Sequence, residues 1–322
     1  MSWLSIFATA FALSYAVIAF MLRSGRVGPM DAPNARSLHT APIPRSGGLG
    51  VLAALLAGVV ADGAWVLAAA LAAVATVSWL DDRHNLPAAW RFAVHFLAAG
   101  VLAVFGLLPD WGAWGVVPLV IGVVWLTNLY NFMDGANGLA GGMALFGFGA
   151  LGLAASQAGG TLSYVALAAA GGAVGFLVFN FHPARIFMGD VGSIPLGFLA
   201  GALGLFGVRD GLWPLAFPLL VFSPFIVDAT LTLARRALRG EKIWQAHREH
   251  YYQRLVQSGW SHRRVALAYY VVMLLASASA LTLRLQPPVI WLYALSLWGL
   301  AYLAIARIID RHWQRYLQTR KP

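Results

Sequence analysis

Long apolar runs separated by short polar stretches make up almost the whole chain. A membrane-spanning helix needs about 20 apolar residues, and by that measure the sequence predicts about eleven spans, with ten as the alternative count. The ninth predicted span contains Pro218 and Pro224, so we expect it to be kinked or broken. The predicted spans are 3–22, 47–61, 64–80, 91–108, 114–130, 138–157, 160–179, 193–208, 212–234, 264–285 and 288–308.

The composition supports an all-α polytopic membrane protein. Hydrophobic residues make up 60% of the chain and charged residues only 11%, whereas a soluble domain carries about 25% charged residues. The stretches between the runs are too short for a second folded domain, so we expect residues 1–322 to form one membrane domain. Because the chain has no cysteine, a disulfide framework and a thiolate nucleophile are both excluded. No small-residue cleavage site follows the first run, which we interpret as a retained helix.

The basic residues predict the orientation of the chain. Eleven spans put the two termini on opposite sides, and only Arg209 and Arg284 of the 22 basic residues then fall on the amino-terminal side. The positive-inside rule therefore predicts a periplasmic amino terminus and a cytoplasmic carboxyl terminus. The formal charge of +10 then reflects these cytoplasmic segments rather than a nucleic-acid partner. The predicted cytoplasmic loops are 23–46, 81–90, 131–137, 180–192 and 235–263.

Several aspartates gather on this same predicted side. A carboxylate at the end of a membrane helix is costly and therefore indicates function by default. Five separate cytoplasmic segments each supply at least one such residue, which predicts a site on the cytoplasmic face. These residues are Asp31, Asp81, Asp82, Asp134, Asp190 and Asp228.

The segment NFHPARIFMGDVGS, residues 180–193, holds Asp190 between two glycines. Glycines let a backbone approach a phosphate closely, and Arg185 and Ser193 lie nearby in the sequence. The alternative interpretation is a polar loop that merely ends one helix and begins the next. A single motif of this kind does not decide between the two.

Two further motifs carry paired or regularly spaced polar groups. In WLDDRHNLP, adjacent carboxylates at Asp81 and Asp82 raise each other's pKa unless a cation is near. The pair indicates a cation or a proton-transfer role, and the alternative is a polar helix end with Arg83 as partner.

In NLYNFMDGANGLAGG, residues at positions 128, 131 and 134 share one face of a helix. These residues, Asn128, Asn131 and Asp134, predict a polar site at the end of a span.

Two cytoplasmic loops offer donors to an anion. In loop 23–46, the donors are His39, Arg36 and Arg45, and the alternative is ordinary positive-inside charge. In AHREHYYQRL, His247 and His250 share one helix face. The pair could form half of a zinc site, but without cysteine the carboxylates would have to complete it, and hard oxygen ligands favour magnesium. We therefore interpret both histidines as donors to a phosphate.

Three further residues complete the set. Arg248 and Arg254 lie near the histidines, and Asp228 lies at the cytoplasmic end of the broken span. A structural ion pair of Asp228 with Arg235 or Arg236 is the alternative interpretation. The longest loop, 235–263, is also expected to include a short amphipathic piece on the membrane surface.

In this order, the motifs resemble those of the polyprenyl-phosphate N-acetylhexosamine-1-phosphate transferases. The resemblance spans residues 1–310 and rests on DAPNARSLHTAPIPRSGG, WLDD…LP, NLYNFMDGANGLA, NFHPARIFMGDVGS and HREHYYQRL. That family includes the phospho-N-acetylmuramoyl-pentapeptide transferase, which has three consecutive histidines where this chain has HREH. The difference favours the branch that initiates O-antigen chains with GlcNAc- or FucNAc-type sugars.

The resemblance implies a reaction and roles for the residues. A UDP-N-acetylhexosamine gives its sugar-1-phosphate to undecaprenyl phosphate at the bacterial inner membrane and releases UMP. Mg²⁺ is the expected cofactor, with Mn²⁺ as a substitute, and Asp190 is the expected metal ligand. Asp81, Asp82 and Asp134 match the family's catalytic aspartates, and Asp81 is the usual candidate for taking a proton from the lipid phosphate. The resemblance also suggests a homodimer. The residues expected to bind substrate are Asn128, Asn131, Asn180, Arg185, His39, Arg45, His247, Arg248, His250 and Asp228.

Two other classes of protein fit parts of this pattern. A transporter or flippase of a polyprenyl-linked or other anionic lipid would also need charged groups within the membrane. Transporter sites usually lie near the bilayer midplane on broken helices, whereas the carboxylates here gather at one surface. A non-catalytic scaffold would not need the full acidic set. The enzyme is therefore the favoured hypothesis.

Overall fold

The structure is a computed structural model that describes residues 2–32, 38, 41–61, 63–106, 108–156, 160–245 and 247–319. Helices dominate it, and two short strands, β1 (Met30–Asp31) and β2 (Ile43–Pro44), pair antiparallel in the loop after the first helix. The helices are α1 (Trp3–Ser24), α2 (Gly48–Ala61), α3 (Trp65–His84), α4 (Ala88–Gly106), α5 (Leu108–Phe132), α6 (Leu139–Ala155), α7 (Thr161–Asn180), α8 (Asp190–Arg209), α9 (Ala216–Val221), α10 (Ser223–Leu238), α11 (Tyr251–Gln257), α12 (His262–Leu283) and α13 (Pro288–Thr319).

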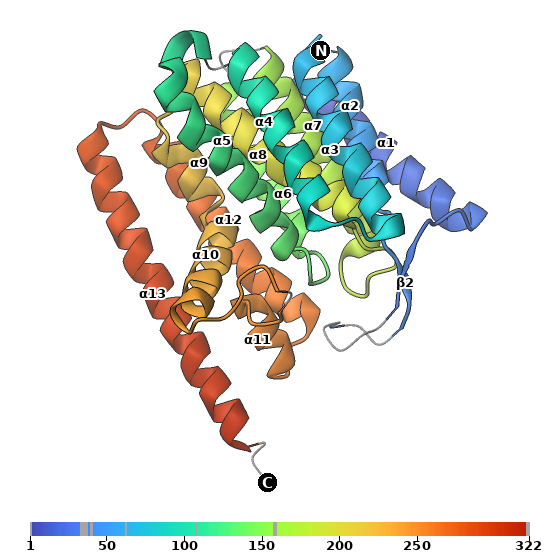
Figure 1. Cartoon of the computed structure of the whole chain (residues 1–322), viewed down its shortest axis with the longest axis vertical. Coiled ribbons are helices and arrows are strands. Elements are labelled where there is room, and N and C mark those ends of the chain that lie inside the picture. The colour runs from blue at the N-terminus through green and yellow to red at the C-terminus, as the bar shows by residue number, and fades with distance from the viewer. Residues whose placement is uncertain are drawn as a thin grey trace.

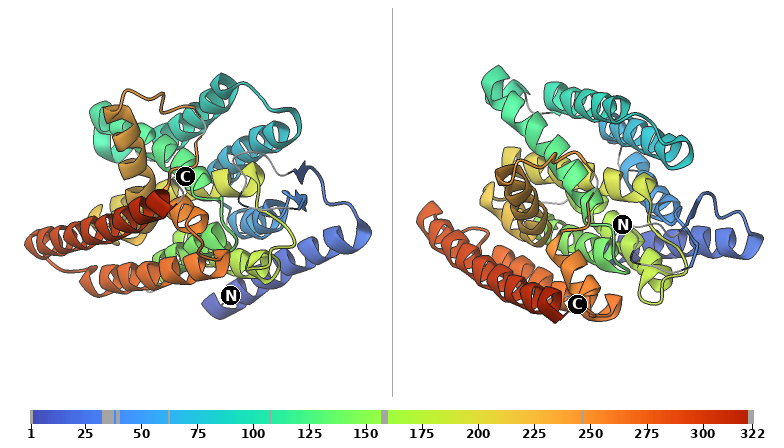
Figure 2. Two further views of the ribbon diagram at one scale, coloured as in Figure 1. Left: turned by 90° about the horizontal axis from the view of Figure 1, so that it is seen from below. Right: turned by 60° about the horizontal axis from the view of Figure 1, so that its bottom comes forward.

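Helices α1 to α8 form a bundle with its long loops at one end (Figure 1). Helix α11 lies beyond that end (Figure 1), and the long helix α13 runs along the side of the molecule opposite α1 (Figure 2). The amino and carboxyl termini lie at opposite ends of the structure (Figure 1). This agrees with termini on opposite sides of a membrane, while the direction of insertion stays a prediction.

Helices α7 and α8 form the centre of the bundle because their small residues admit close neighbours. In the most apolar 18-residue stretch of each helix, 78% of α7 and 89% of α8 is buried inside the protein. A Cβ on Gly175 would lie 2.6 Å from the carbonyl oxygen of Phe11, and one on Gly197 would lie 2.8 Å from that of Leu126. Small residues that let helix backbones approach are the usual means of packing in membranes. They bring α1 against α7 and α5 against α8.

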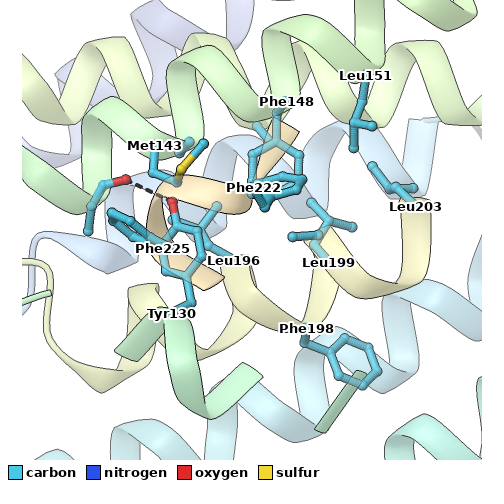
Figure 3. Close-up of a cluster of buried hydrophobic side chains, with 14 of the residues drawn as sticks. Tyr130, Met143, Phe148, Leu151, Leu196, Phe198, Leu199, Leu203, Phe222 and Phe225 are labelled. Carbon is cyan, nitrogen blue, oxygen red and sulfur yellow. Dashed lines mark hydrogen bonds between the residues drawn. The ribbon is translucent and has the colours of Figure 1, made fainter. Parts of the chain in front are cut away.

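A cluster of large buried side chains joins α5, α6 and α8 to the break between α9 and α10 (Figure 3). The Tyr130 hydroxyl donates a 2.7 Å hydrogen bond to the carbonyl of Ala140, so its one polar atom is satisfied. Phe148 and Phe222 meet edge to face with ring centroids 5.7 Å apart. This packing fixes the end of α5, where the polar motif at 128–134 begins.

The predicted all-α polytopic fold is confirmed, and each predicted span overlaps helix. Eight helices are long and apolar enough to cross a membrane, within the part of the chain that the structure describes. Helices α2 and α6 have only 14 and 17 residues and fall below that length. The count of eleven spans therefore stays a prediction.

The predicted break in the ninth span is confirmed. Helix α9 ends at Val221 and α10 begins at Ser223, with Phe222 between them. Pro224 lies in the first turn of α10, where its missing N–H and fixed φ are tolerated. Proline therefore starts a new helix here instead of continuing the old one.

Three predicted boundaries near the site differ from the observed helix ends by a few residues. Helix α3 continues to His84, so Asp81 and Asp82 lie on its last turn and not in a loop. Helix α8 begins at Asp190, three residues before the predicted start at 193. In the predicted loop 235–263, α10 runs on to Leu238 and α11 forms a further short helix. Polar residues end an apolar run in sequence, but they stay helical where they find hydrogen-bond partners.

Candidate active site

A polar cavity of about 320 Å³ lies at the loop-rich end of the bundle. Its walls come from the loop before α2, the end of α3, the loop between α5 and α6, the start of α8 and helix α11. Some of its lining residues were predicted from the sequence as site residues, and others were not. The lining includes Asp31, Arg45, Asp82, Asn131, Asp134, Asn137, Asn180, Phe187, Gly189, Asp190, Gln253 and His262.

The two adjacent aspartates of α3 face different partners, because consecutive residues on a helix do not share a face. Asp81 accepts a 2.7 Å hydrogen bond from the backbone N–H of Leu86 and another of 2.7 Å from Arg91. Both of its oxygens are therefore occupied, and Asp81 is not among the cavity-lining residues. The cation that the pair requires is Arg91 rather than Arg83, which lies exposed over the ring of Trp79.

Asp82 holds the start of α8 in place. It is buried and accepts a 3.0 Å hydrogen bond from the backbone N–H of Val191, in the first turn of α8. A carboxylate at that position also interacts favourably with the helix dipole. The guanidinium Nε of Arg45 lies 3.6 Å from Asp82 Oδ1. Gly189, at φ 72°, passes so close to the Arg45 carbonyl that a Cβ would collide with it.

Asp190, the first residue of α8, projects to the cavity with its side chain 25% exposed. Its one ion-pair partner among the described residues is Arg91, at 3.6 Å. Arg91 thus bridges Asp190 and Asp81, a role that its basic charge on the predicted cytoplasmic side did not reveal. The three-residue connection between α3 and α4 is the signal that could have paired Asp81 with Arg91.

Two of the three polar residues in the motif at 128–134 line the cavity, and the third does not. Asn131 accepts a 2.6 Å hydrogen bond from the Ser193 hydroxyl, and both Asn131 and Asp134 line the cavity. Burial, followed by the charges of Asp190 and Asp82, raises the pKa of Asp134 well above its usual range. Asn128 lies one turn earlier, donates to the carbonyl of Val124 at 2.7 Å, and is not among the lining residues.

Of two further predicted residues in segment 180–193, Asn180 lines the cavity and Arg185 does not. Asn180 is buried, accepts from the backbone N–H of Gly138 at 2.8 Å and donates to the Ile186 carbonyl at 2.9 Å. It therefore ties together two loops that line the cavity. Arg185 is exposed, stacks over the ring of Phe179 and lies outside the cavity lining.

The histidines of the HREH segment lie beside the cavity rather than in its wall. His250 is buried with its Nδ1 3.4 Å from Asp228. Burial, followed by the nearby His250 and Arg236, lowers the pKa of His247 to about 4. Arg248 is exposed. Their predicted role toward a phosphate stays a prediction, and His39 lies outside the residues that the structure describes.

Asp228 anchors α11. Its carboxylate accepts hydrogen bonds from the backbone N–H groups of Tyr251 and Tyr252 at 2.9 and 3.1 Å, and from the Tyr269 hydroxyl at 2.5 Å. The Tyr252 hydroxyl in turn reaches the Phe132 carbonyl at 3.1 Å, beside Asp134. Asp228 thereby positions α11, which contributes Gln253 to the cavity.

Asn137 and His262 line the cavity, His182 lies against both, and this cluster was not predicted from the sequence. His262 Nδ1 accepts from the Asn137 N–H at 3.2 Å, so its Nε2 carries the proton and faces the Leu38 carbonyl at 3.0 Å. The ring of His182 stacks parallel to that of His262 at 5.9 Å. The position of Asn137 three residues after Asp134 is the signal that could have marked it.

The donor set suits a hard divalent cation. In the described part of the chain, no three acidic or histidine side chains are already arranged to hold a metal ion. Asp82, Asp134 and Asp190 nevertheless line one cavity. Mg²⁺ is usually bound through one or two carboxylates together with substrate phosphates rather than by an all-protein cage. The residues therefore fit magnesium brought together with a phosphorylated ligand.

The fold and the cavity define a polytopic α-helical membrane protein with a carboxylate- and arginine-lined site at one end of its helices. Residues 64–208 match the family model of glycosyl transferase family 4. The chain belongs to this family. The matched segment contains Asp81, Asp82, Asp134 and Asp190, whereas Asp228 and the HREH segment lie outside it.

Curated relatives include enzymes acting on polyprenyl phosphates. The chain is 31% identical to a probable undecaprenyl-phosphate N-acetylglucosaminyl 1-phosphate transferase of Bacillus subtilis (strain 168), over 83% of this chain and 80% of the relative. It is 31% identical to the decaprenyl-phosphate N-acetylglucosaminephosphotransferase of Mycolicibacterium smegmatis, over 81% and 77%. It is also 33% identical to a phospho-N-acetylmuramoyl-pentapeptide-transferase of a Synechococcus species, over 77% and 81%.

Proposed function

We propose that this chain transfers N-acetylhexosamine-1-phosphate from a UDP-sugar to undecaprenyl phosphate. An oxygen of the acceptor phosphate attacks the β-phosphorus of the UDP-sugar, and the bond from that phosphorus to the oxygen of the α-phosphate breaks. The products are the undecaprenyl-diphosphate sugar and UMP. Membership of a family whose curated relatives are phospho-sugar transferases supports this class of reaction.

The observation that carries the proposal is the meeting of Asp82, Asp134 and Asp190 at one cavity, with Arg45 and Arg91 beside them. Both substrates are anions that repel each other, so their reaction needs positive charge in a fixed place. When bound, Mg²⁺ neutralises charge on the diphosphate oxygens. Asp190 lines the cavity with a 25% exposed side chain and has one ion pair, at 3.6 Å, and it is the residue that we assign to the metal.

The contacts of Asp81 refine its role within the proposal. Its oxygens are taken by Leu86 and Arg91, and it does not line the cavity. Asp81 therefore acts by holding Arg91 next to Asp190 rather than by touching the lipid phosphate. The Arg91 guanidinium then aligns the Asp190 carboxylate for the cation.

The position of the cavity suits a lipid acceptor. Its walls are the ends of helices that are apolar along their length, so a phosphate at headgroup level can reach the carboxylates while the polyprenyl tail stays in the bilayer. We further propose the cytoplasmic face of a bacterial inner membrane, a GlcNAc- or FucNAc-type donor, and a role in starting O-antigen or another envelope glycan. The homodimer suggested by the family resemblance is part of the same proposal.

The test is UMP release by the purified chain with undecaprenyl phosphate and Mg²⁺. UDP-GlcNAc, UDP-FucNAc, UDP-QuiNAc and UDP-MurNAc-pentapeptide are offered separately. We expect UMP with a GlcNAc- or FucNAc-type donor, and none with UDP-MurNAc-pentapeptide. Absence of UMP with every donor, in protein shown to be folded, would contradict the proposal. Movement of labelled lipid across vesicles without UMP release would favour a flippase instead.

A further inference from the structure

A second cavity of about 600 Å³ lies between α10, α11, α12 and α13. It shares no lining residue with the carboxylate cavity, and the two lie on different sides of α11: Gln253 faces the first, whereas Tyr251 and Leu255 face the second. Most of its wall is aliphatic, with Leu231 and Val272 on one side and Ile305 on the other. A space of this kind in a membrane protein suits a hydrocarbon chain.

One end of this cavity is basic. Arg311 and Arg315 line it, and neither has a carboxylate partner among the residues that the structure describes. The one aspartate of α13, Asp310, is already bound to Arg235 at 2.8 Å and to Arg254 at 2.9 Å. The cavity therefore carries uncompensated positive charge at that end.

The sequence of α13 places this basic end at the membrane surface. From 288 to 306 the helix carries no charged residue, and from Arg307 onward charges recur about every four residues. A helix leaves the hydrocarbon where its charges begin. The aliphatic wall is thus at the depth of lipid tails, and Arg311 and Arg315 are at the depth of headgroups.

Two polar atoms at the cavity lack partners. The Tyr251 side chain is 4% exposed, yet its hydroxyl makes no hydrogen bond to any described residue, and the same holds for Nε2 of His312. Both residues line the cavity. Burial raises the pKa of Tyr251 to about 12, so the hydroxyl keeps its proton and is available as a donor. Buried polar groups are normally hydrogen-bonded, so these two call for a ligand with an acceptor.

We propose that this cavity binds an anionic glycerophospholipid of the surrounding bilayer. Its acyl chains lie along Leu231, Val272 and Ile305, and its phosphate lies between Arg311, Arg315 and the Tyr251 hydroxyl. The lipid is not the polyprenyl phosphate of the proposed reaction, because α11 and the Asp228 network separate this cavity from Asp190.

Bound lipid would stabilise α11 and, through it, the end of α5 beside the carboxylate cavity. It would pack against Tyr251, whose backbone N–H is held by Asp228, and the next residue, Tyr252, reaches the Phe132 carbonyl beside Asp134. Filling the cavity therefore stabilises the folded chain. This stabilisation can be measured without any assay of the proposed transferase reaction.

The experiment compares the thermal-unfolding midpoint of the detergent-purified chain with added phosphatidylglycerol and with phosphatidylcholine of the same acyl chains. We expect the midpoint to rise with phosphatidylglycerol and to rise much less with phosphatidylcholine. Each basic residue near an anionic lipid contributes on the order of a tenfold effect or somewhat less, so Arg311→Gln/Arg315→Gln should bind phosphatidylglycerol about 10- to 30-fold more weakly. The matched control, Arg263→Gln/Arg307→Gln, removes two exposed arginines outside the cavity lining.

Tyr251→Phe is a second, milder variant. It keeps the ring, over which the guanidinium groups of Arg235 and Arg254 lie at 5.3 Å, and removes only the unpartnered hydroxyl. We expect the same midpoint as in the parent chain without lipid and a smaller rise with phosphatidylglycerol.

Three results would overturn the proposal. The first is an equal rise with phosphatidylcholine, and the second is an equal loss of the effect in both arginine double variants. The third is stabilisation by undecaprenyl phosphate, but not by phosphatidylglycerol, that disappears in Arg311→Gln/Arg315→Gln. That last result would assign the cavity to the acceptor instead.

Discussion

Asp134 and Asp190, at the end of the bundle, have very different surroundings from the carboxylates of α10–α13. Around α11, Asp228 accepts hydrogen bonds from Tyr251, Tyr252 and Tyr269, and Asp310 binds two arginines. At the end of the bundle, Asp190 has one ion pair at 3.6 Å. The Asp134 carboxylate accepts no hydrogen bond from a described residue.

This difference separates two uses of the same side chain. A buried carboxylate whose oxygens are fully paired stabilises structure, whereas one that lines a cavity with unfilled hydrogen-bonding capacity is available to a ligand. The first kind should affect stability when mutated, and the second kind should affect activity. Each of the following changes tests that division.

Removal of divalent metal should have the largest effect. EDTA is expected to lower UMP release at least about 10²-fold, because the charge on the diphosphate is then not neutralised. Mg²⁺ or Mn²⁺ should restore it. The thermal-unfolding midpoint should change little, since no fold contact uses the metal. Full turnover in EDTA would contradict the assignment of Asp190 to a cation.

Loss of the arginine bridge should come next. Arg91→Gln leaves Asp81 and Asp190 without their common partner and is expected to lower kcat about 10²-fold, the cost of one preorganised charged donor. Arg91→Lys should recover part of that loss. Arg83→Gln, one turn beyond Trp79 on an exposed surface, is the control and should stay near the activity of the parent chain. Equal activity of Arg91→Gln and Arg83→Gln would show that the Arg91 bridge between Asp81 and Asp190 does not contribute to catalysis.

A paired carboxylate in the other region should behave in the opposite way. Asp228→Asn weakens the charge-assisted hydrogen bonds that hold α11, so we expect a loss of about 1–3 kcal/mol in the free energy of unfolding. At low temperature, UMP release should stay within about tenfold of the parent chain. An Asp228→Asn protein with an unchanged midpoint and no activity would place Asp228 with the reacting groups.

The smallest effect should be the pH dependence due to His247. Its pKa is lowered to about 4 in the folded chain, against about 6.5 when unfolded. The unfolded state therefore takes up the proton first as pH falls, so stability is lost between about pH 6.5 and 4. Because this side chain is partly exposed, solvent screening keeps the loss small.

His247→Gln should make that loss of stability shallower, measured as the unfolding midpoint between pH 7 and 4.5. Identical slopes in His247→Gln and the parent chain would show that His247 is not buried as the structure has it.

The sequence predicted the helices well because an apolar run of about 20 residues leaves the backbone few alternatives in a membrane. It also predicted the broken ninth span, since Pro218 and Pro224 interrupt a continuous hydrogen-bond ladder. It placed Asp82, Asn131, Asp134 and Asp190 at one end, and the structure brings them to one cavity.

The partners of these residues were not predictable in the same way. Arg91 and His262 reach the site through contacts across helix ends and loops, and no sequence periodicity records such contacts. His250 and Asp228 resemble site residues in sequence because they are polar groups at a membrane surface. Only the three-dimensional contacts show that they hold α11.

The most direct test uses the two aspartates at opposite ends of α8. Asp190 begins this helix at the cavity, and Asp210 follows its last residue at the other end, paired with Arg209. UMP release is measured for Asp190→Asn and Asp210→Asn at matched unfolding midpoints. We predict near-complete loss for Asp190→Asn and near-normal turnover for Asp210→Asn. Near-normal turnover by Asp190→Asn would contradict the assignment of this cavity as the active site.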